Sequence, residues 1–243
     1  ILILVVSGNG GHLYHWLHHG ITDPTHVDYD AVVAGKAGYL NQWGWVIRAI
    51  VYFTLWSLLG LFYWRNSVAQ DESGDVAYTH RMQKLAPITA VIFALTCTFA
   101  AIDWIMSLAP HWFSTIFGVY FFAISCCSFF SIQILIVYWL QRHGRLQNEL
   151  TIEHWQDMGK LLFAFGVCFH AYIGFSQFML IWYANVPEET GWWITRMTGP
   201  WKVLAIVLFI CHFGVPFILL VTKHTKRIKG VLAAIAVWML LMS

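Results

Sequence analysis

The sequence AIDWIMSLAPHWFS, residues 101–114, decides how the chain is interpreted, because it places one carboxylate, Asp103, inside an otherwise apolar segment. An ionisable side chain within a membrane span is costly unless it is paired or hydrated, and such residues therefore tend to mark functional sites. We expect Asp103 to have either a functional role or a structural partner on a neighbouring helix.

Composition indicates a membrane protein. Of the 243 residues, 59% are hydrophobic and only 11% are charged, whereas about 25% of residues are charged in an ordinary soluble domain. The net charge of +2 gives no indication of nucleic-acid binding. The five cysteines lie inside apolar segments without the spacing of a metal or iron–sulfur motif, so we expect core residues rather than ligands at Cys97, Cys126, Cys127, Cys168 and Cys211.

The distribution of apolar residues predicts the number of membrane crossings. With about 20 apolar residues per crossing, we predict five complete spans, at residues 43–64, 86–109, 115–140, 160–184 and 201–222. Two truncated spans are predicted at residues 1–7 and 231–243, so we interpret the chain as an interior fragment of a longer polypeptide. The predicted fold class is an all-α, polytopic transmembrane helical bundle that forms a single domain over residues 1–243.

The basic residues predict the orientation of these spans. One side of the membrane carries three of them, Lys36, Arg196 and Lys202. The other side carries ten, at Arg65, Arg81, Lys84, Arg142, Arg145, Lys160, Lys223, Lys226, Arg227 and Lys229. The positive-inside rule makes this second side, with loops 65–85, 141–159 and 223–230, cytoplasmic. Asp103 then lies at the outer end of its span.

The first outer loop is rich in histidine. If residues 12–19 are helical, His12, His15 and His19 share one face, and a short helix along the membrane surface is expected. His18 adds a fourth imidazole, but a cluster of histidines with no acid or cysteine in register is weak support for a metal site. A second outer loop contains PEET, residues 187–190, which we interpret as a solvated helix N-terminus or a docking contact.

Polar residues form a stripe on the span that carries Asp103. Thr89, Thr96 and Asp103 are spaced by seven, and Ser107 follows four residues later. This stripe either orders water along a proton path or consists of hydroxyls that bond to their own helix and hold its neighbours. Arg48 lies at a depth similar to that of Asp103, so we expect the two to pair, either as a structural ion pair or as part of a titratable outer site that includes His111.

Two intramembrane histidines form a second candidate set. His170 and Gln177 share one face of their span, and His212 lies at a similar depth on the next. The histidines are candidates for a proton relay, for quinone contacts, for axial ligation of a b-type haem or for simple hydrogen bonding.

Several of these motifs together resemble one family. The runs FHAY (169–172) and QFMLIWYANVPEET (177–190), with AIDWIMSL (101–108) and PHWFST (110–115), closely resemble the ActF family. Its members are the smaller of the two NrfD-like (polysulfide reductase-type) integral membrane subunits of bacterial alternative complex III.

The resemblance implies a subunit of a quinol:cytochrome c or quinol:oxidase oxidoreductase in the bacterial inner membrane. The implied partners are a larger, ActC-like NrfD-type subunit, a periplasmic ActB-like iron–sulfur subunit and c-type cytochrome subunits, with a terminal oxidase as a further candidate; the iron–sulfur clusters and haems would belong to these partners. For this chain we expect an anchoring role with a proton pathway. Direct quinol binding, a purely structural scaffold and a haem-b anchor are also considered.

Overall fold

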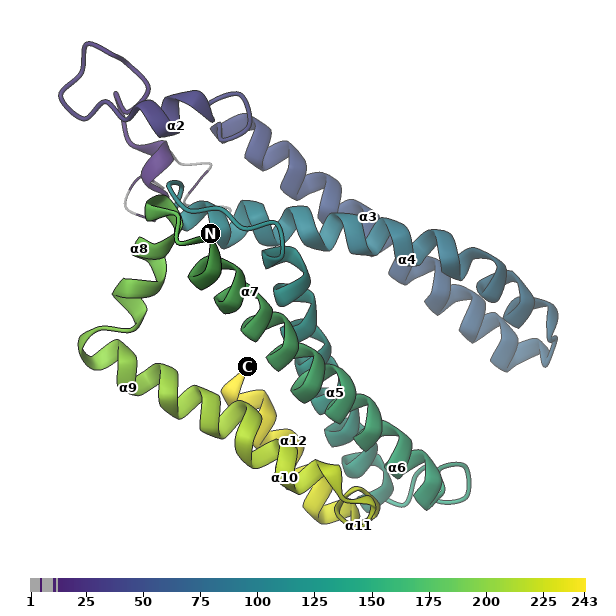
Figure 1. Ribbon diagram of the computed structural model, residues 1–243. Helices are drawn as coiled ribbons and strands as arrows, with labels where there is room; N and C mark the ends of the chain where they lie inside the picture. Colours follow the sequence, from purple (N-terminus) through teal and green to yellow (C-terminus); the bar gives the residue numbers. More distant parts are fainter. Residues whose placement is uncertain (1–4, 6–10, 12) are drawn as a thin grey trace. The chain divides into compact units, whose positions relative to one another are not determined.

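A computed structural model describes residue 5, residue 11 and residues 13–243 (Figure 1). Across these residues the secondary structure is helical and contains no strand. Five helical segments are long and apolar enough to cross a membrane, at Gln42–Ser73, Ala77–Leu108, Phe117–Arg142, Ile152–Ala184 and Gly199–Val221. Each contains most or all of one predicted span. The truncated span predicted at residues 1–7 lies, except for Val5, outside the described residues.

The chain divides into two compact units, residues 1–118 and 119–243. The first unit contains a short helix, α2 (Ala31–Gly35), followed by a long hairpin of α3 (Gln42–Ser73) and α4 (Ala77–Trp104). A single 3₁₀ turn, η3 (Met106–Leu108), follows α4. Whether both units form the single bundle expected from the sequence stays a prediction.

Most of segment 65–85, which the sequence predicts as a loop, is helical, because α3 continues to Ser73 and α4 already begins at Ala77. Its cytoplasmic position stays a prediction. Hydropathy marks where a helix leaves the apolar layer, whereas backbone hydrogen bonds continue through polar residues that favour helix. The helix ends at Gly74, whose φ of 68° is left-handed and whose N–H donates to the Gln70 carbonyl. Glycine adopts this conformation without steric cost.

The predicted helix over residues 12–19 is also wrong. His12 lies outside the described residues, and the remainder contains only a 3₁₀ turn, η2 (His15–Leu17). The turn stops at His18, whose ψ of 137° is extended. Tyr14 and Trp16 from this segment are instead buried against Trp45 and Ala49 of α3, in the core of the first unit.

The second unit contains three long helical segments and three shorter helices. They are α5 (Phe117–Arg142), whose first two residues belong to the first unit; α6 (Ile152–Leu161), η4 (Leu162–Phe169) and α7 (His170–Ala184) without a break; α8 (Pro187–Arg196); α9 (Gly199–Leu208), η5 (Phe209–Gly214) and α10 (Val215–Val221) without a break; α11 (Lys223–Arg227); and α12 (Lys229–Met242). Both η4 and η5 are π-helical. The predicted helix N-terminus at Pro187 is confirmed, and proline occupies the first turn of α8.

The core of the second unit is centred on Trp155 and Leu162, which pack with Ile134, Leu220 and Leu232. Polar contacts at the end of α5 close this core. The Gln141 Oε1 accepts from the Trp155 indole at 3.1 Å and from the Lys229 ammonium at 2.8 Å, while its amide nitrogen donates to the carbonyls of Leu146 and Leu150. One buried side chain therefore joins α5, α6, α12 and the loop between α5 and α6.

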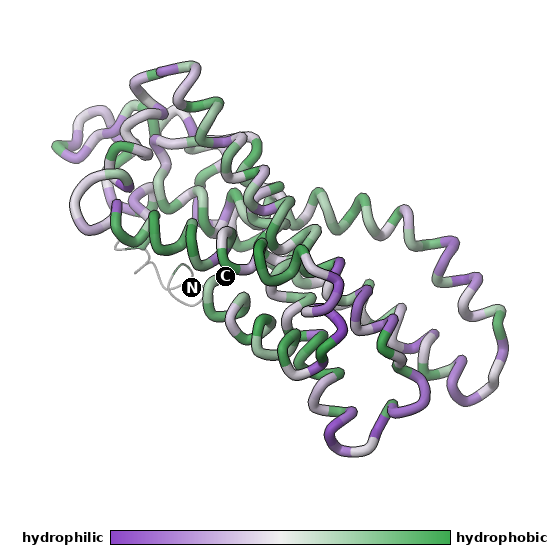
Figure 2. Tube along the Cα trace, turned by 60° about the horizontal axis from the view of Figure 1, so that its bottom comes forward, coloured by the Kyte–Doolittle hydropathy of each residue, from purple (hydrophilic) through white to green (hydrophobic). Residues whose placement is uncertain are grey.

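Hydropathy along the chain fits a membrane environment. Figure 2 shows apolar residues through the middle of the long helices and hydrophilic residues near the turn that joins α3 and α4. Large apolar side chains on the helix surfaces are exposed within the chain, among them Leu58, Phe129, Leu180 and Ile218. Lipid or partner subunits would cover such a surface.

Candidate functional sites

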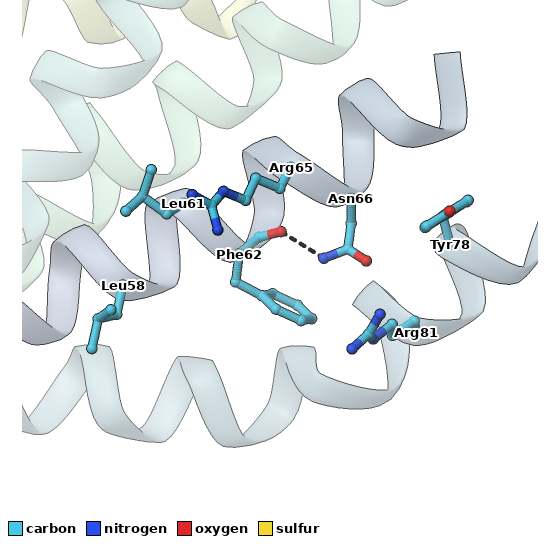
Figure 3. A pocket seen from close by; sticks show the side chains of 7 residues that line it. All are labelled: Leu58, Leu61, Phe62, Arg65, Asn66, Tyr78 and Arg81. Carbon is cyan, nitrogen blue, oxygen red and sulfur yellow. Dashed lines mark hydrogen bonds between the residues drawn. The ribbon is translucent and has the colours of Figure 1, made fainter. Parts of the chain in front are cut away.

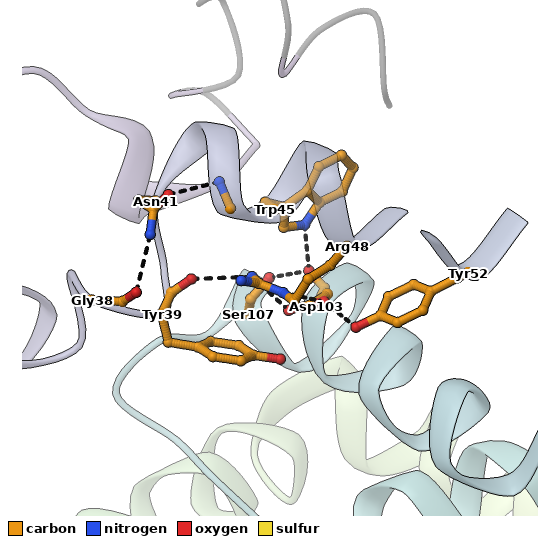
Figure 4. A network of polar contacts seen from close by, with 9 residues as sticks. Gly38, Tyr39, Asn41, Trp45, Arg48, Tyr52, Asp103 and Ser107 are labelled. Carbon is orange, nitrogen blue, oxygen red and sulfur yellow. Dashed lines mark hydrogen bonds and ion pairs between the residues drawn. The ribbon is translucent and has the colours of Figure 1, made fainter. Parts of the chain in front are cut away.

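The predicted pairing of Arg48 with Asp103 is present (Figure 4). The Arg48 Nε donates to Asp103 Oδ2 at 2.9 Å, and a terminal guanidinium nitrogen donates to Oδ1 at 3.0 Å. The Tyr52 hydroxyl donates to Oδ2 at 2.8 Å. Asp103 is fully buried, whereas 23% of the Arg48 side chain is exposed. A bidentate pair with a third donor satisfies a buried carboxylate well.

The backbone carbonyl of Asp103 also accepts two side-chain hydrogen bonds. It accepts from the Trp45 indole at 2.8 Å and from the Ser107 hydroxyl at 2.5 Å. The candidate Ser107 therefore contacts the backbone of Asp103 rather than its carboxylate. The Trp45 bond joins the start of α3 to the end of α4, and the Ser107 bond joins η3 to α4.

Tyrosines surround the ion pair. Arg48 donates to the Tyr39 carbonyl at 3.1 Å and its guanidinium carbon lies 3.9 Å from the centre of the Tyr39 ring. Burial and then the Asp103 carboxylate raise the pKa of Tyr39 to about 12. The same two causes raise the pKa of Tyr14 to about 12, and its hydroxyl donates to the Trp104 carbonyl at 3.0 Å. Both phenols therefore stay protonated at neutral pH.

The threonine stripe has the contacts of helix-to-helix packing. The Thr96 hydroxyl donates to the Ile92 carbonyl at 2.8 Å and accepts from the Trp56 indole at 2.9 Å. Thr89 bonds in the same way to its own helix and to Tyr63 of α3. These contacts match the structural interpretation of the stripe, in which hydroxyls bond to their own helix and hold a neighbour.

His111 is paired with Asp30 instead of Asp103. The His111 Nε2 lies 2.6 Å from Asp30 Oδ2, and the His15 Nε2 lies 4.0 Å from the same oxygen. Asp30 also caps α2, because its Oδ1 accepts from the N–H groups of Val32 and Val33. Burial opposes ionisation of Asp30, but these two N–H groups and His111 outweigh it and lower the pKa of the carboxyl.

The surface histidines do not assemble a metal site in the part of the chain that the structure describes. There, no group of three or more histidine, cysteine or acidic side chains is arranged to hold a metal ion. The ring of His19 lies 6.2 Å from that of His26.

His170 and His212 are brought together within the second unit. Their ring centres lie 4.4 Å apart, and the Tyr120 ring lies 4.8 Å from that of His170. The two nitrogens of His212 face two carbonyl oxygens, Nδ1 that of Met242 and Nε2 that of Gly166, each at 3.3 Å. His212 lies within η5, and His170 directly follows η4. Single π-helical turns in α-helices occur frequently at functional sites.

Gln177 lies on the same helix as His170. Its side chain is 5% exposed, and its Nε2 has no hydrogen-bond partner among the described residues. The His170 Nδ1 is likewise buried without one. The amide donor of Gln177 and the ring nitrogen of His170 are thus available, on one face of α7, to a water molecule or a small polar ligand.

The histidine pair is too close for a haem held between the two rings. Iron bound by both imidazoles would lie between them with Fe–N bonds of about 2 Å, which places the ring centres roughly 6 Å apart. The observed 4.4 Å leaves no space for a porphyrin. This arrangement therefore favours a proton relay, quinone contacts or simple hydrogen bonding over haem ligation.

Fold and composition together define the class of protein, a multi-pass α-helical membrane protein. No protein-family model matches the chain, and no curated protein matches it either.

Sequence reasoning missed several partners of the candidate residues. Tyr52 follows Arg48 by four residues and therefore shares its helix face, a signal that is present in the sequence. Asp30 directly precedes an apolar run, which is typical of a helix N-cap. Tyr39 and Tyr120 reach their sites through tertiary packing, and no local pattern indicates them.

Proposed function

We propose that this chain is an integral membrane subunit of a quinol:cytochrome c or quinol:oxidase oxidoreductase of the alternative complex III type. It would anchor the periplasmic redox subunits and move protons within the membrane. The proposal of the family is supported by the motif resemblance at residues 101–115 and 169–190 and by five membrane-crossing segments.

One observation carries the proton-handling role, the placement of His212 between two carbonyl oxygens and against His170. A neutral imidazole has one N–H and donates to only one of these carbonyls, whereas an imidazolium donates to both. The site therefore offers hydrogen-bond acceptors to the protonated ring. His170, with a buried Nδ1 that has no partner in the described chain, would accept or deliver the proton, with Gln177 beside the route.

Asp103 has a different role in this proposal. Both of its carboxylate oxygens are occupied by Arg48, and Tyr52 adds a further bond. A carboxylate with this many donors is a poor proton acceptor, so we assign Asp103 to hold α3 and α4 at the outer end. Thr89 and Thr96 would extend the same contact along the hairpin.

The hydrogen bonds of Asp103, Thr89 and Thr96 to neighbouring helices favour a second candidate function, a purely structural anchor. A third candidate, direct quinol binding, would need a quinone oxygen to reach His170 or Gln177. In either case the partners are an ActC-like membrane subunit, an ActB-like iron–sulfur subunit and c-type cytochromes, with a terminal oxidase as a further candidate. The membrane would be the bacterial inner membrane, with segments 65–85, 141–159 and 223–230 on the cytoplasmic side, as the basic residues indicate.

The test compares histidine variants in the assembled complex. We expect His170→Gln and His212→Gln to slow quinol turnover and its proton release by about tenfold or more, since a positioned acid–base group contributes at least that much. His224→Gln is the matched control, because this histidine is exposed and lies on α11, a helix that carries neither member of the pair. Unchanged turnover and proton release in correctly assembled His170 and His212 variants would leave only the structural anchor.

A further inference from the structure

A hollow of about 430 Å³ lies on the α3–α4 hairpin, on the part nearer the turn at residues 74–76 (Figure 3). Its lining is divided by polarity. Leu58, Leu61 and Phe62 of α3 form an apolar floor, and Arg65 of α3 and Arg81 of α4 supply two positive charges. We name this hollow the hairpin pocket.

The two arginines have no carboxylate partner within the described chain. Neither forms an ion pair there, although Arg48 on the same helix does. Arg81 reaches from α4 toward Phe62, with its guanidinium carbon 5.8 Å from the ring centre, and Arg65 extends along α3 toward Leu61 (Figure 3). The hairpin pocket thus contains two guanidinium groups whose charge is not neutralised within the described residues.

A buried amide lies at the same level as the arginines. Asn66 is only 7% exposed, and its side-chain nitrogen donates to the Phe62 carbonyl at 2.6 Å. This bond uses one of the two amide N–H groups and leaves the other for a ligand. Arg65, Asn66 and Arg81 thus supply charged and neutral donors to the lining of the pocket.

The position of the hairpin pocket along α3 matches the boundary of a membrane. Tyr63 and Trp64 precede Arg65, and Trp64 is 62% exposed. Aromatic side chains of this kind are enriched at the level of lipid headgroups. One to two turns deeper, Leu58 and Leu61 are 58% and 43% exposed, as expected for side chains that contact acyl chains.

We infer that the hairpin pocket binds one anionic phospholipid. Its phosphate would accept hydrogen bonds from Arg65 and Arg81, and an acyl chain would lie along Leu58 and Leu61. Charge complementarity favours an anionic headgroup, since basic pockets between membrane helices recognise such lipids. The apolar floor favours a lipid over free phosphate, which would gain nothing from it. This inference does not depend on the proposed function.

Native mass spectrometry of the purified protein tests the inference, with added phosphatidylglycerol or phosphatidylcholine. We expect the wild type to retain phosphatidylglycerol preferentially. The Arg65→Gln/Arg81→Gln variant should bind it about tenfold more weakly or worse, because each basic residue near the membrane surface contributes substantially to anionic lipid binding. Lys84→Gln/Arg145→Gln is the control, because it removes the same charge from exposed positions that do not line the pocket.

A second variant keeps both arginines and fills the apolar floor. Leu61→Trp places a larger ring on an exposed position, so the core is unaffected. This variant, too, should bind phosphatidylglycerol more weakly than the wild type. Equal retention of phosphatidylcholine by the wild type would overturn the inference. Equal losses in the control and the arginine variant would overturn it as well, as would displacement of the lipid by inorganic phosphate alone.

Discussion

Removal of either member of the Arg48–Asp103 pair should destabilise the hairpin, but by unequal amounts. Arg48→Gln leaves a fully buried carboxylate, and breaking a buried pair in this way costs about 3–5 kcal/mol. Asp103→Asn leaves the guanidinium, which is 23% exposed and therefore partly hydrated, so we expect a smaller cost of about 2–3 kcal/mol. The double variant has no unpaired charge and should be more stable than Arg48→Gln alone.

The assay is reversible unfolding in mixed detergent and dodecyl sulfate micelles, followed by tryptophan fluorescence. Trp45, which donates to the Asp103 backbone, is one of the 14 tryptophans that contribute to this signal. Lys84→Gln, an exposed change on α4, is the control and should match the wild type within about 0.5 kcal/mol. Two results would contradict this prediction: Arg48→Gln unfolding at the same dodecyl sulfate fraction as the wild type, or a double variant that is less stable than both single variants.

Three other predictions concern the loop, a helix contact and the second core. The folded chain lowers the pKa of Asp30 below its ordinary value of 3.8, chiefly through the N–H groups of Val33 and Val32, which the carboxylate caps. The ionised cap should therefore stabilise α2 above pH 3.8 and be lost as the pH falls through the lower pKa of the folded chain, which faster amide exchange in α2 would show. Gly118→Ala should cost about 1–3 kcal/mol, since the new carbon would lie 2.5 Å from a side chain of α4, whereas Gly60→Ala meets nothing within 4 Å. Gln141→Leu should lower the free energy of unfolding by about 1–3 kcal/mol, because its buried indole partner loses its acceptor.

The apolar segments were predictable because hydropathy depends on composition alone. Five crossings and the pairing of Arg48 with Asp103 followed from span length and depth. Helix ends were harder to predict, since α3 extends past the apolar layer to its cap at Gly74. Hydropathy contains no information about that polar extension.

The candidate sites were predictable as residues but less so as contacts. Depth alone placed His170 near His212, yet the π-helical turns that shape their surroundings have no sequence signal. Proximity in sequence suggests His111 beside Asp103, but the loop that contains Asp30 lies against it. The conformation of a long irregular loop depends on tertiary contacts, and local patterns do not determine it.

The most direct test of the proposed function is purification of the tagged protein from its own membrane in mild detergent, with quinol oxidation measured on the product. We predict that the chain co-purifies with iron–sulfur and c-type haem subunits and that the preparation reduces cytochrome c with quinol. A chain that purifies without these subunits, from membranes that contain them, and that shows no quinol-dependent activity would contradict the proposed function.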